Sequence, residues 1–353
     1  MKHIRKILII VLMVSFIFIL SSCEKKNDAA NFKFKYWNDC AAIDSLTEYV
    51  KDVTNEKSEN YIPKEDRIAT FDMDGTLFGE LFPAYFEYLL FAHRVLDDSS
   101  CTNKTEEMIE TATWIRENKY TWNMKQTGLE LRHANGQAKA FAGLSIKEFE
   151  DYVKDFANTD AEGFNNLKYK DAIYLPMVEV VNYLQLNDFI TYIVSGSDRF
   201  ICRAIASEAF NIPYNQIIGM DVKLVSNNQG DTDGLNYLYT LDDTVIRTDE
   251  LVIKNLKMNK VYLITQEIGK QPVLAFGNSS GDSSMLNYAM SNPNYKGMGY
   301  MLIADDIDRD YPNLEETEKR RVSFESSGYT IISMKDDFKT IYGENVTKKI
   351  GNN

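Results

Sequence analysis

Short, almost continuous apolar runs recur along the chain after residue 60, and polar or amphipathic stretches separate them. Each run spans four to six residues, which suits a strand and is too short for a helix. Runs without polar alternation predict strands buried on both faces, as in a parallel sheet. Helical patterns such as Leu175–Leu186 and Arg199–Phe210 lie between most of them. We therefore predict an α/β fold with a Rossmann-like, doubly wound parallel sheet as its core. The predicted strands are Ile68–Phe71, Phe189–Val194, Gln216–Met220, Pro272–Phe276, Gly299–Ile303 and Tyr329–Met334.

The stretch between the first two predicted strands is far longer than an ordinary crossover. Residues 79–172 are largely helical in pattern and rich in aromatic side chains, which predicts an inserted, mainly helical cap domain. The core would then comprise residues 61–78 and 173–345, and residues 346–353 would form a tail.

A second, smaller insertion is predicted at residues 221–251. Turn-forming residues cluster at Ser226–Gly230 and at Asp231–Gly234, and apolar residues alternate with polar ones around them. This pattern predicts a β-hairpin.

The N-terminus has the pattern of a secretory signal. Three of the first six residues are basic, and Ile7–Leu20 is almost wholly apolar but too short to span a membrane comfortably. We therefore predict a signal peptide over residues 1–22. An uncleaved N-terminal anchor is the alternative.

Leu20–Cys23 resembles a bacterial lipobox, which implies that Cys23 is lipidated and becomes the mature N-terminus. Residues 23–60 would then hold the lipidated terminus, a polar tether and an N-terminal segment. The prediction is a lipoprotein of the cell envelope, anchored in a membrane and facing the periplasm or the cell surface.

Charge excludes one large class of function. The formal net charge is -13, and basic residues form no stripe along the chain. Nucleic-acid binding requires clustered Lys and Arg to neutralise phosphates, so we expect no nucleic-acid partner. The sequence also gives no sign of an obligate protein partner.

Polar residues that could act in catalysis or bind a ligand follow several predicted strands. Asp72 and Asp74 come directly after the first strand, and Gly75 permits a sharp turn behind them. A calcium-binding EF-hand loop starting at Asp72 is excluded, because its sixth and twelfth positions are Leu77 and Pro83. Further along the chain come Ser195-Gly196-Ser197, Lys260 and the Gly277–Asp282 loop. The carboxyl ends of parallel strands share one edge, so these groups should converge there.

Taken together, these stretches resemble the haloacid dehalogenase superfamily of phosphohydrolases over residues 61–345. Asp72 to Thr76 resembles its DxDGT motif, and Ser195, Lys260 and Gly277–Asp282 resemble the later motifs in the same order. Two segments near the end, Leu302–Asp310 and Ile331–Lys335, resemble a phosphoserine-phosphatase-like bacterial branch.

The resemblance implies a magnesium-dependent phosphomonoester hydrolase. Asp72 would attack phosphorus to form an aspartyl-phosphate, and Asp74 would act as general acid and then as general base. Ser195, Gly196 and Lys260 would bind the phosphoryl group. The metal ligands would be Asp72, Asp74 through its carbonyl, Asp282 and Asn278. Many relatives have Asp where this chain has Asn278, so we expect Asp282 to be a better ligand than Asn278.

The substrate would be a small phosphorylated metabolite, with phosphoserine as one candidate. Predicted substrate contacts are Glu80, Trp114, Tyr120 and Trp122, since all lie in the expected cap. Two alternatives stay open: a phosphotransferase that uses the same intermediate, and a catalytically inactive lipoprotein that keeps the fold for binding.

Overall fold

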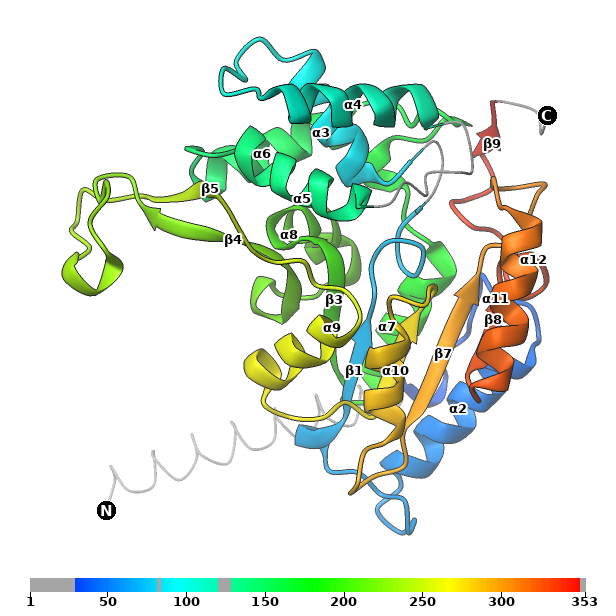
Figure 1. Ribbon diagram of the computed structural model, residues 1–353. Coiled ribbons are helices and arrows are strands. Elements are labelled where there is room, and N and C mark those ends of the chain that lie inside the picture. Colours follow the sequence, from blue (N-terminus) through cyan, green and yellow to red (C-terminus); the bar gives the residue numbers. More distant parts are fainter. Residues whose placement is uncertain (1–28, 81–83, 120–127, 350–353) are drawn as a thin grey trace, which may run out of the picture.

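The computed structural model describes residues 29–80, 84–119 and 128–349. Its centre is a seven-stranded sheet in the order β5-β4-β3-β1-β6-β7-β8 (Figure 1). All neighbouring pairs are parallel except β4 with β5. The strands are β1 Ile68–Phe71, β3 Ile190–Asp198, β4 Ile217–Ser226, β5 Val245–Ile253, β6 Leu274–Gly277, β7 Met298–Ile303 and β8 Thr330–Ser333. The predicted α/β class with a mostly parallel central sheet is therefore confirmed.

The strand order reverses at β1. From β1 the chain passes to β3 and β4 on one side, and it later returns to β6, β7 and β8 on the other. Such a reversal opens a crevice at the carboxyl ends of the strands that flank it, which is where open α/β sheets bind ligands. The predicted catalytic motifs follow β1, β3 and β6, so the topology gathers them at this crevice.

Helices cover both faces of the sheet. Alternate strand residues face opposite sides: Phe71, Ile193 and Phe276 pack with α2, α7 and α8, whereas Val194, Ala275 and Met301 pack with α9, α10 and α11. The helices are α2 Ala41–Thr54, α7 Leu175–Leu186, α8 Arg199–Phe210, α9 Met258–Leu263, α10 Ser283–Met290, α11 Leu314–Ser326 and the short α12 Met334–Asp337.

The chain between β1 and β3 is mainly helical. It comprises α3 Phe86–Leu96, α4 Glu106–Asn118, α5 Leu129–Ala140 and α6 Ile146–Ala157, which lie together above the carboxyl edge of the sheet (Figure 1). Helix α6 starts with a capping box, in which Ser145 and Glu148 satisfy each other's backbone N–H groups. Phe141 and Phe149 pack between these helices, so the group has its own apolar interior.

Strands β4 and β5 form the β-hairpin that lies in residues 221–251, and both run beyond that range. The hairpin projects from the sheet as an arm (Figure 1). Its β5 strand also pairs with the loop between α5 and α6, because Gly143 N donates to Arg247 O at 2.8 Å and Arg247 N donates to Leu144 O at 2.9 Å. The arm therefore joins the sheet to the helical segment.

Both ends of the described chain are tied to the core. Trp37 is buried and its indole N–H donates to Pro176 O at 2.8 Å. At the other end, β9 Thr347–Lys348 pairs with β2 Phe164–Asn165, so part of the predicted tail belongs to a small second sheet. Cys202, in α8, is a free and buried thiol.

Several sequence predictions fall on residues that lie outside the described part of the chain: the signal peptide of residues 1–22, Cys23, Tyr120 and Trp122. Among the helices of residues 29–80, 84–119 and 128–349, none has the length and apolar character required to cross a membrane.

Candidate active site

A tight loop at the end of β1 carries the two predicted catalytic aspartates. Asp72 N donates to Phe276 O at 2.9 Å, which extends the pairing of β1 with β6 by one residue. The chain then turns at Gly75, whose φ is +80° and whose N–H donates to Phe78 O at 2.7 Å. A Cβ at Gly75 would lie 2.0 Å from Asn278 Nδ2 and 2.6 Å from Glu80 Oε2. Only glycine fits this turn, which brings the first loop against the loop after β6.

Lys260 lies at the centre of the site. Its Nζ is 2.5 Å from Asp72 Oδ1 and 2.6 Å from Asp282 Oδ1, and the lysine side chain is 0% exposed. Burial alone would lower the pKa of Lys260, but the adjacent Asp282 and Asp72 carboxylates outweigh it and raise that pKa. Burial and the nearby Asp282 charge raise the pKa of Asp72. One lysine thus faces two buried carboxyl groups, which leaves the cluster short of positive charge.

Asp282 is held by its own loop as well as by Lys260. Its Oδ2 accepts hydrogen bonds from Asn278 N at 3.1 Å, Ser279 N at 3.0 Å and Ser279 Oγ at 3.1 Å. Both oxygens of this carboxylate are therefore engaged. Its contacts are those of a residue that shapes the loop and orients Lys260.

Asp74 is held by a serine. Ser197 Oγ donates to Asp74 Oδ2 at 2.6 Å. Burial raises the pKa of Asp74 to about 6, against the opposing effect of this hydrogen bond. A carboxyl group whose pKa lies near neutrality suits proton donation and proton acceptance in one cycle.

Ser195 and Gly196 lie at the carboxyl end of β3, next to Ser197. Ser195 is fully buried, and its Oγ accepts a hydrogen bond from Ser197 N at 3.0 Å. Asn255 Nδ2 donates to Ser195 O at 2.9 Å, which fixes the backbone there. A Cβ at Gly196 would lie 2.7 Å from Leu256 Cδ2, so this position is closely packed.

Glu80 lies beside the catalytic loops and is almost fully buried. Its Oε2 accepts from Asn278 Nδ2 at 2.7 Å and its Oε1 accepts from Tyr85 Oη at 3.0 Å. Burial raises the pKa of Glu80 to about 7, although the Arg320 charge and these hydrogen bonds oppose the rise.

Behind Asp74 and Ser197 lies a buried charged group from three parts of the chain. Lys254 Nζ donates to Glu87 Oε1 at 2.9 Å, and Asp198 N donates to Glu87 Oε2 at 3.3 Å. Arg247 pairs with Asp198 through an Nη2–Oδ2 distance of 2.6 Å. Glu87 belongs to α3 and Arg247 to β5, so these contacts bind the helical segment and the arm to the end of β3.

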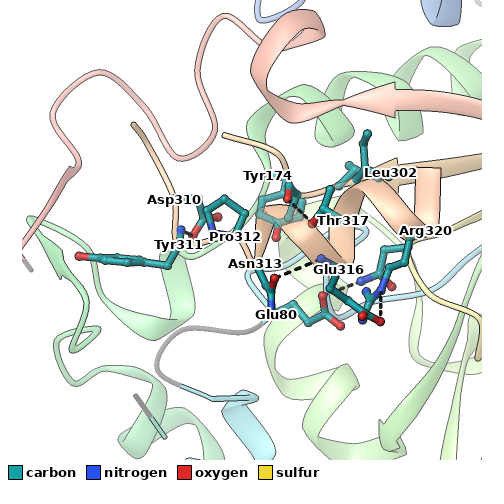
Figure 2. A pocket seen from close by; sticks show the side chains of 13 residues that line it. Glu80, Tyr174, Leu302, Asp310, Tyr311, Pro312, Asn313, Glu316, Thr317 and Arg320 are labelled. Atoms are coloured by element: carbon teal, nitrogen blue, oxygen red, sulfur yellow. Dashed lines mark hydrogen bonds and ion pairs between the residues drawn. The ribbon is translucent and has the colours of Figure 1, made fainter. Parts of the chain in front are cut away.

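A hollow adjoins the site on the side of α11. Glu80 and Asn278 form its inner wall, and the loop before α11 supplies Asp310 and Tyr311. In Figure 2, Glu80 lies close to the α11 side chains Glu316 and Arg320. The hollow is lined by Glu80, Tyr174, Asn278, Leu302, Ile303, Ala304, Asp310, Tyr311, Pro312, Asn313, Glu316, Thr317 and Arg320.

The structure thus gathers most of the predicted site residues and leaves one apart. Asp72, Lys260, Asp282, Asn278 and Glu80 are linked by the contacts above. Ser197 links Asp74 to Ser195 at the end of β3, beside Gly196. Of the lysines near position 260, Lys254 binds Glu87 and Lys270 binds Asp66. Trp114 is half-buried among the helices of residues 84–157 and lines neither this hollow nor its neighbour around Phe78 and Tyr342.

The residues fit a magnesium ion by the chemistry of their oxygen donors. In the described part of the chain, no residue donates a hydrogen bond to Asp72 Oδ2 or to Asn278 Oδ1. Within the same part, no three His, Cys, Asp or Glu side chains form a metal-binding group. Mg²⁺ is commonly held by one or two carboxylates with waters and substrate phosphate, so such a donor set suffices. Both Asp282 oxygens have partners in the protein, whereas Asn278 Oδ1 receives no hydrogen bond from the described residues, so these contacts favour Asn278 as the ligand from this loop. The preference for Asp282 drawn from the sequence stays a prediction.

Three residues that complete the site are assigned no role from the sequence: Ser197, Glu87 and Lys254. Ser197 had a signal, since it lies two positions after Ser195 in an extended strand and therefore on the same side. Glu87 and Lys254 had none, because their pairing joins positions that are 167 residues apart.

Known proteins resemble the chain in structure only. No family model and no curated protein sequence matches it. A conserved functionally unknown protein from Anaerococcus prevotii DSM 20548 superposes with a TM-score of 0.50 at 13% identity, covering 86% of this chain and 94% of that one. Cytosolic 5'-nucleotidase IIIB bound to cytidine gives a TM-score of 0.48 at 11% identity, covering 85% of this chain and 88% of that one.

A phosphoserine phosphohydrolase-like protein from Francisella tularensis subsp. tularensis SCHU S4 gives a TM-score of 0.37 at 14% identity, covering 67% of this chain and 87% of that one. At such low sequence identities, a structural likeness supports a shared fold and not a shared activity. The chain therefore shares its α/β fold with the Anaerococcus prevotii protein.

Proposed function

We propose that the protein is a magnesium-dependent phosphomonoester hydrolase of the haloacid dehalogenase type. The observation that carries this proposal is the buried cluster of Asp72, Lys260 and Asp282 at the strand-order reversal, with Asp74 two residues from Asp72. A carboxylate beside one buried lysine suits attack on a phosphoryl group, because the lysine offsets negative charge on both.

The chain's own residues divide the reaction into two halves. In the first, a carboxylate oxygen of Asp72 forms a bond to phosphorus as the bond to the alcohol oxygen breaks, and Asp74 gives its proton to that oxygen. In the second, Asp74 takes a proton from water, which attacks the aspartyl-phosphate and releases phosphate. Lys260 and the Ser195-Gly196 turn bind the phosphoryl oxygens throughout.

Asp72, the Asp74 carbonyl and Asn278 would hold Mg²⁺ in this proposal. When bound, the ion would screen the nucleophile from the phosphate dianion and orient the phosphoryl group. The requirement for a cation follows from the cluster itself, in which two buried carboxyl groups share one lysine.

The substrate we propose is a small phosphorylated metabolite whose alcohol part occupies the hollow between Glu80 and α11. Among the described residues, the acids Glu80, Asp310 and Glu316 line that hollow with one cation, Arg320. A leaving group with a positive charge would therefore suit it, and phosphoserine is one candidate. The helices of residues 84–157 would act as a cap that limits access to small molecules.

The proposal places the enzyme in the cell envelope. Support comes from the sequence alone: the signal pattern of residues 1–22 and the lipobox-like stretch that ends at Cys23. Substitution Cys23→Ala should then change the mature N-terminus and move the protein out of the detergent phase. An unchanged N-terminus and unchanged partitioning would contradict lipidation.

Hydrolysis of p-nitrophenyl phosphate by the full-length protein tests the proposed activity. We expect turnover with Mg²⁺, loss of turnover with EDTA and recovery when Mg²⁺ is restored. Asp72→Asn should abolish turnover while circular dichroism stays unchanged, and Asp231→Asn, at an exposed position on the arm, should leave turnover unaffected. Full activity of a folded Asp72→Asn variant would remove Asp72 from the nucleophile role.

A further inference from the structure

We infer that Ser197 is a positioning residue for the general acid, whose hydroxyl group holds the Asp74 carboxyl group in the orientation that meets the leaving alcohol. The inference rests on the proposed function. Ser197 Oγ donates to Asp74 Oδ2 at 2.6 Å, and within the described residues this is the one hydrogen bond that the Asp74 side chain receives. Ser197 engages Oδ2, so Oδ1 is the oxygen left to carry and transfer the proton.

Ser197 is itself held from behind, which makes it a rigid support. Its N–H donates to Ser195 Oγ at 3.0 Å, and the side chain is 5% exposed. The next residue, Asp198, caps α8 by accepting a hydrogen bond from Phe200 N at 2.9 Å. Asp198 also pairs with the buried Arg247. The Ser197 hydroxyl group therefore lies between the end of β3 and the start of α8. Among the described residues, Asp74 Oδ2 is the one acceptor to which it donates.

Ser195 and Ser197 have separate tasks in this arrangement. A hydroxyl that donates its proton to Asp74 has none left to donate to a phosphoryl oxygen. The Ser195 hydroxyl accepts from Ser197 N, a bond that does not use its own proton, and we assign that proton to the phosphoryl group. Loss of Ser195 should therefore affect every phosphate ester, whereas loss of Ser197 should affect the step that needs a proton.

The need for a proton depends on the leaving group. As Asp72 bonds to phosphorus, the breaking P–O bond leaves its electron pair on the ester oxygen. An alkoxide is strongly basic and must be protonated by Asp74 as it leaves, whereas nitrophenolate departs without a proton. General acid catalysis contributes about 10²–10⁴-fold where it operates, so this contrast is large enough to measure.

The test is the dependence of kcat/KM on the leaving group. The full-length protein, Ser197→Ala, Ser197→Thr and Ser195→Ala are assayed with p-nitrophenyl phosphate, phenyl phosphate and a series of alkyl phosphates. The ratio kcat/KM covers the steps up to departure of the alcohol, so hydrolysis of the aspartyl-phosphate, which is common to all esters, does not enter. Thermal denaturation checks that each variant is folded.

We expect Ser197→Ala to lower kcat/KM by about 10- to 100-fold for alkyl phosphates, the loss associated with a hydrogen bond to a charged group, and by less than about 3-fold for p-nitrophenyl phosphate. Ser197→Thr keeps the hydroxyl and should restore most of the alkyl activity. Ser195→Ala should lower kcat/KM for every ester, p-nitrophenyl phosphate included, because it removes a contact to the phosphoryl group. If the wild type is active and Ser197→Ala lowers kcat/KM equally for every ester, the role given to Ser197 is wrong, whereas the proposed function stands. A wild type that hydrolyses none of the esters would overturn the proposed function, and this inference with it.

Discussion

Lys260 and Asp72 form a buried ion pair with an Nζ–Oδ1 distance of 2.5 Å, although 188 residues separate them in the chain. The same Nζ contacts Asp282 at 2.6 Å. The lysine therefore acts in the folded protein before any substrate arrives, since it keeps two carboxyl groups together that would otherwise repel each other.

Removal of this lysine should destabilise the protein. Lys260→Met leaves two buried carboxyl groups without a cation, and loss of one member of a buried ion pair costs about 3–5 kcal/mol of the free energy of unfolding. Mg²⁺ should recover part of the loss, because the ion can lie near both carboxylates. The measurement is denaturant unfolding with and without Mg²⁺. Lys319→Met, at an exposed lysine on α11, is the control and should unfold like the wild type in both conditions. An unchanged unfolding midpoint for Lys260→Met would contradict the role given to this pair.

Gly75→Ala should disrupt the site as well as the backbone. The φ of +80° costs an alanine about 1–2 kcal/mol, and its Cβ would collide with Asn278 Nδ2. Gly143→Ala is a matched control, since its φ is +86° and a Cβ there meets no atom within 4 Å. We expect the control to lose stability modestly and to keep its activity, and Gly75→Ala to lose both more severely. Equal effects in calorimetry and in a phosphatase assay would show that the contact with Asn278 does not matter.

The arm should depend on one buried ion pair for its attachment. Arg247 and Asp198 side chains are 0% and 1% exposed, and their Nη2–Oδ2 distance is 2.6 Å. Arg247→Met should lower the free energy of unfolding by about 3–5 kcal/mol, because Asp198 is left buried and unpaired. Lys223→Met, which breaks an exposed pair with Glu250 on the same arm, should change stability little. If the two variants unfold alike, the buried pair does not secure the arm.

His133 should make stability depend on pH. Burial lowers its pKa from 6.5 to about 4, with Lys254 adding to the decrease and Glu87 opposing it. Between these values the unfolded chain binds a proton that the folded protein refuses, so stability falls as pH decreases from about 6.5 to about 4. Each pKa unit corresponds to about 1.4 kcal/mol, so the total is about 3 kcal/mol.

His133→Gln isolates this contribution. Groups with raised pKa values, such as Glu80 and Asp310, change stability in the opposite sense over this range, but they are present in both proteins and largely cancel in the comparison. Chemical denaturation at several pH values should show a steeper acid loss in the wild type than in the variant. Parallel curves would mean that His133 does not titrate across the transition.

Local sequence pattern predicted the sheet and its helices well. Leu175–Leu186 and Arg199–Phe210 are helices with the predicted bounds. Each buries apolar side chains, the first has Pro176 in its first turn, and Asp198 caps the second. The first predicted strand has the observed bounds, Ile68–Phe71, whereas the others differ by one to six residues at an end, where pairing with a neighbour decides the boundary. Strand β3 extends to Asp198, for instance, since its irregular pairing with β4 continues that far.

Contacts across the chain were beyond the reach of the sequence pattern. Lys254, Lys257, Lys260 and Lys270 are alike as residues in sequence, and the fold alone puts Lys260 between Asp72 and Asp282. Likewise, the hydrogen bond from Ser197 to Asp74 depends on the registry of β3 against β1. The hydrogen bonds that Asp282 accepts from its own loop likewise depend on how that loop turns, which the sequence pattern does not predict.

Strand β5 has a consequence for any attempt to exchange the helical segment between proteins. Its backbone pairs with β4 on one edge and with Gly143 and Leu144 on the other, and Arg247 from the same strand reaches Asp198. A graft cut at residues 79 and 172 would therefore lose the backbone hydrogen bonds between β5 and the loop at Gly143 and Leu144, because β5 would stay in the donor protein. The unit that can be exchanged is therefore discontinuous in sequence. A chimera that transplants residues 79–172 must include residues 244–254 as well, or replace their contacts by redesign.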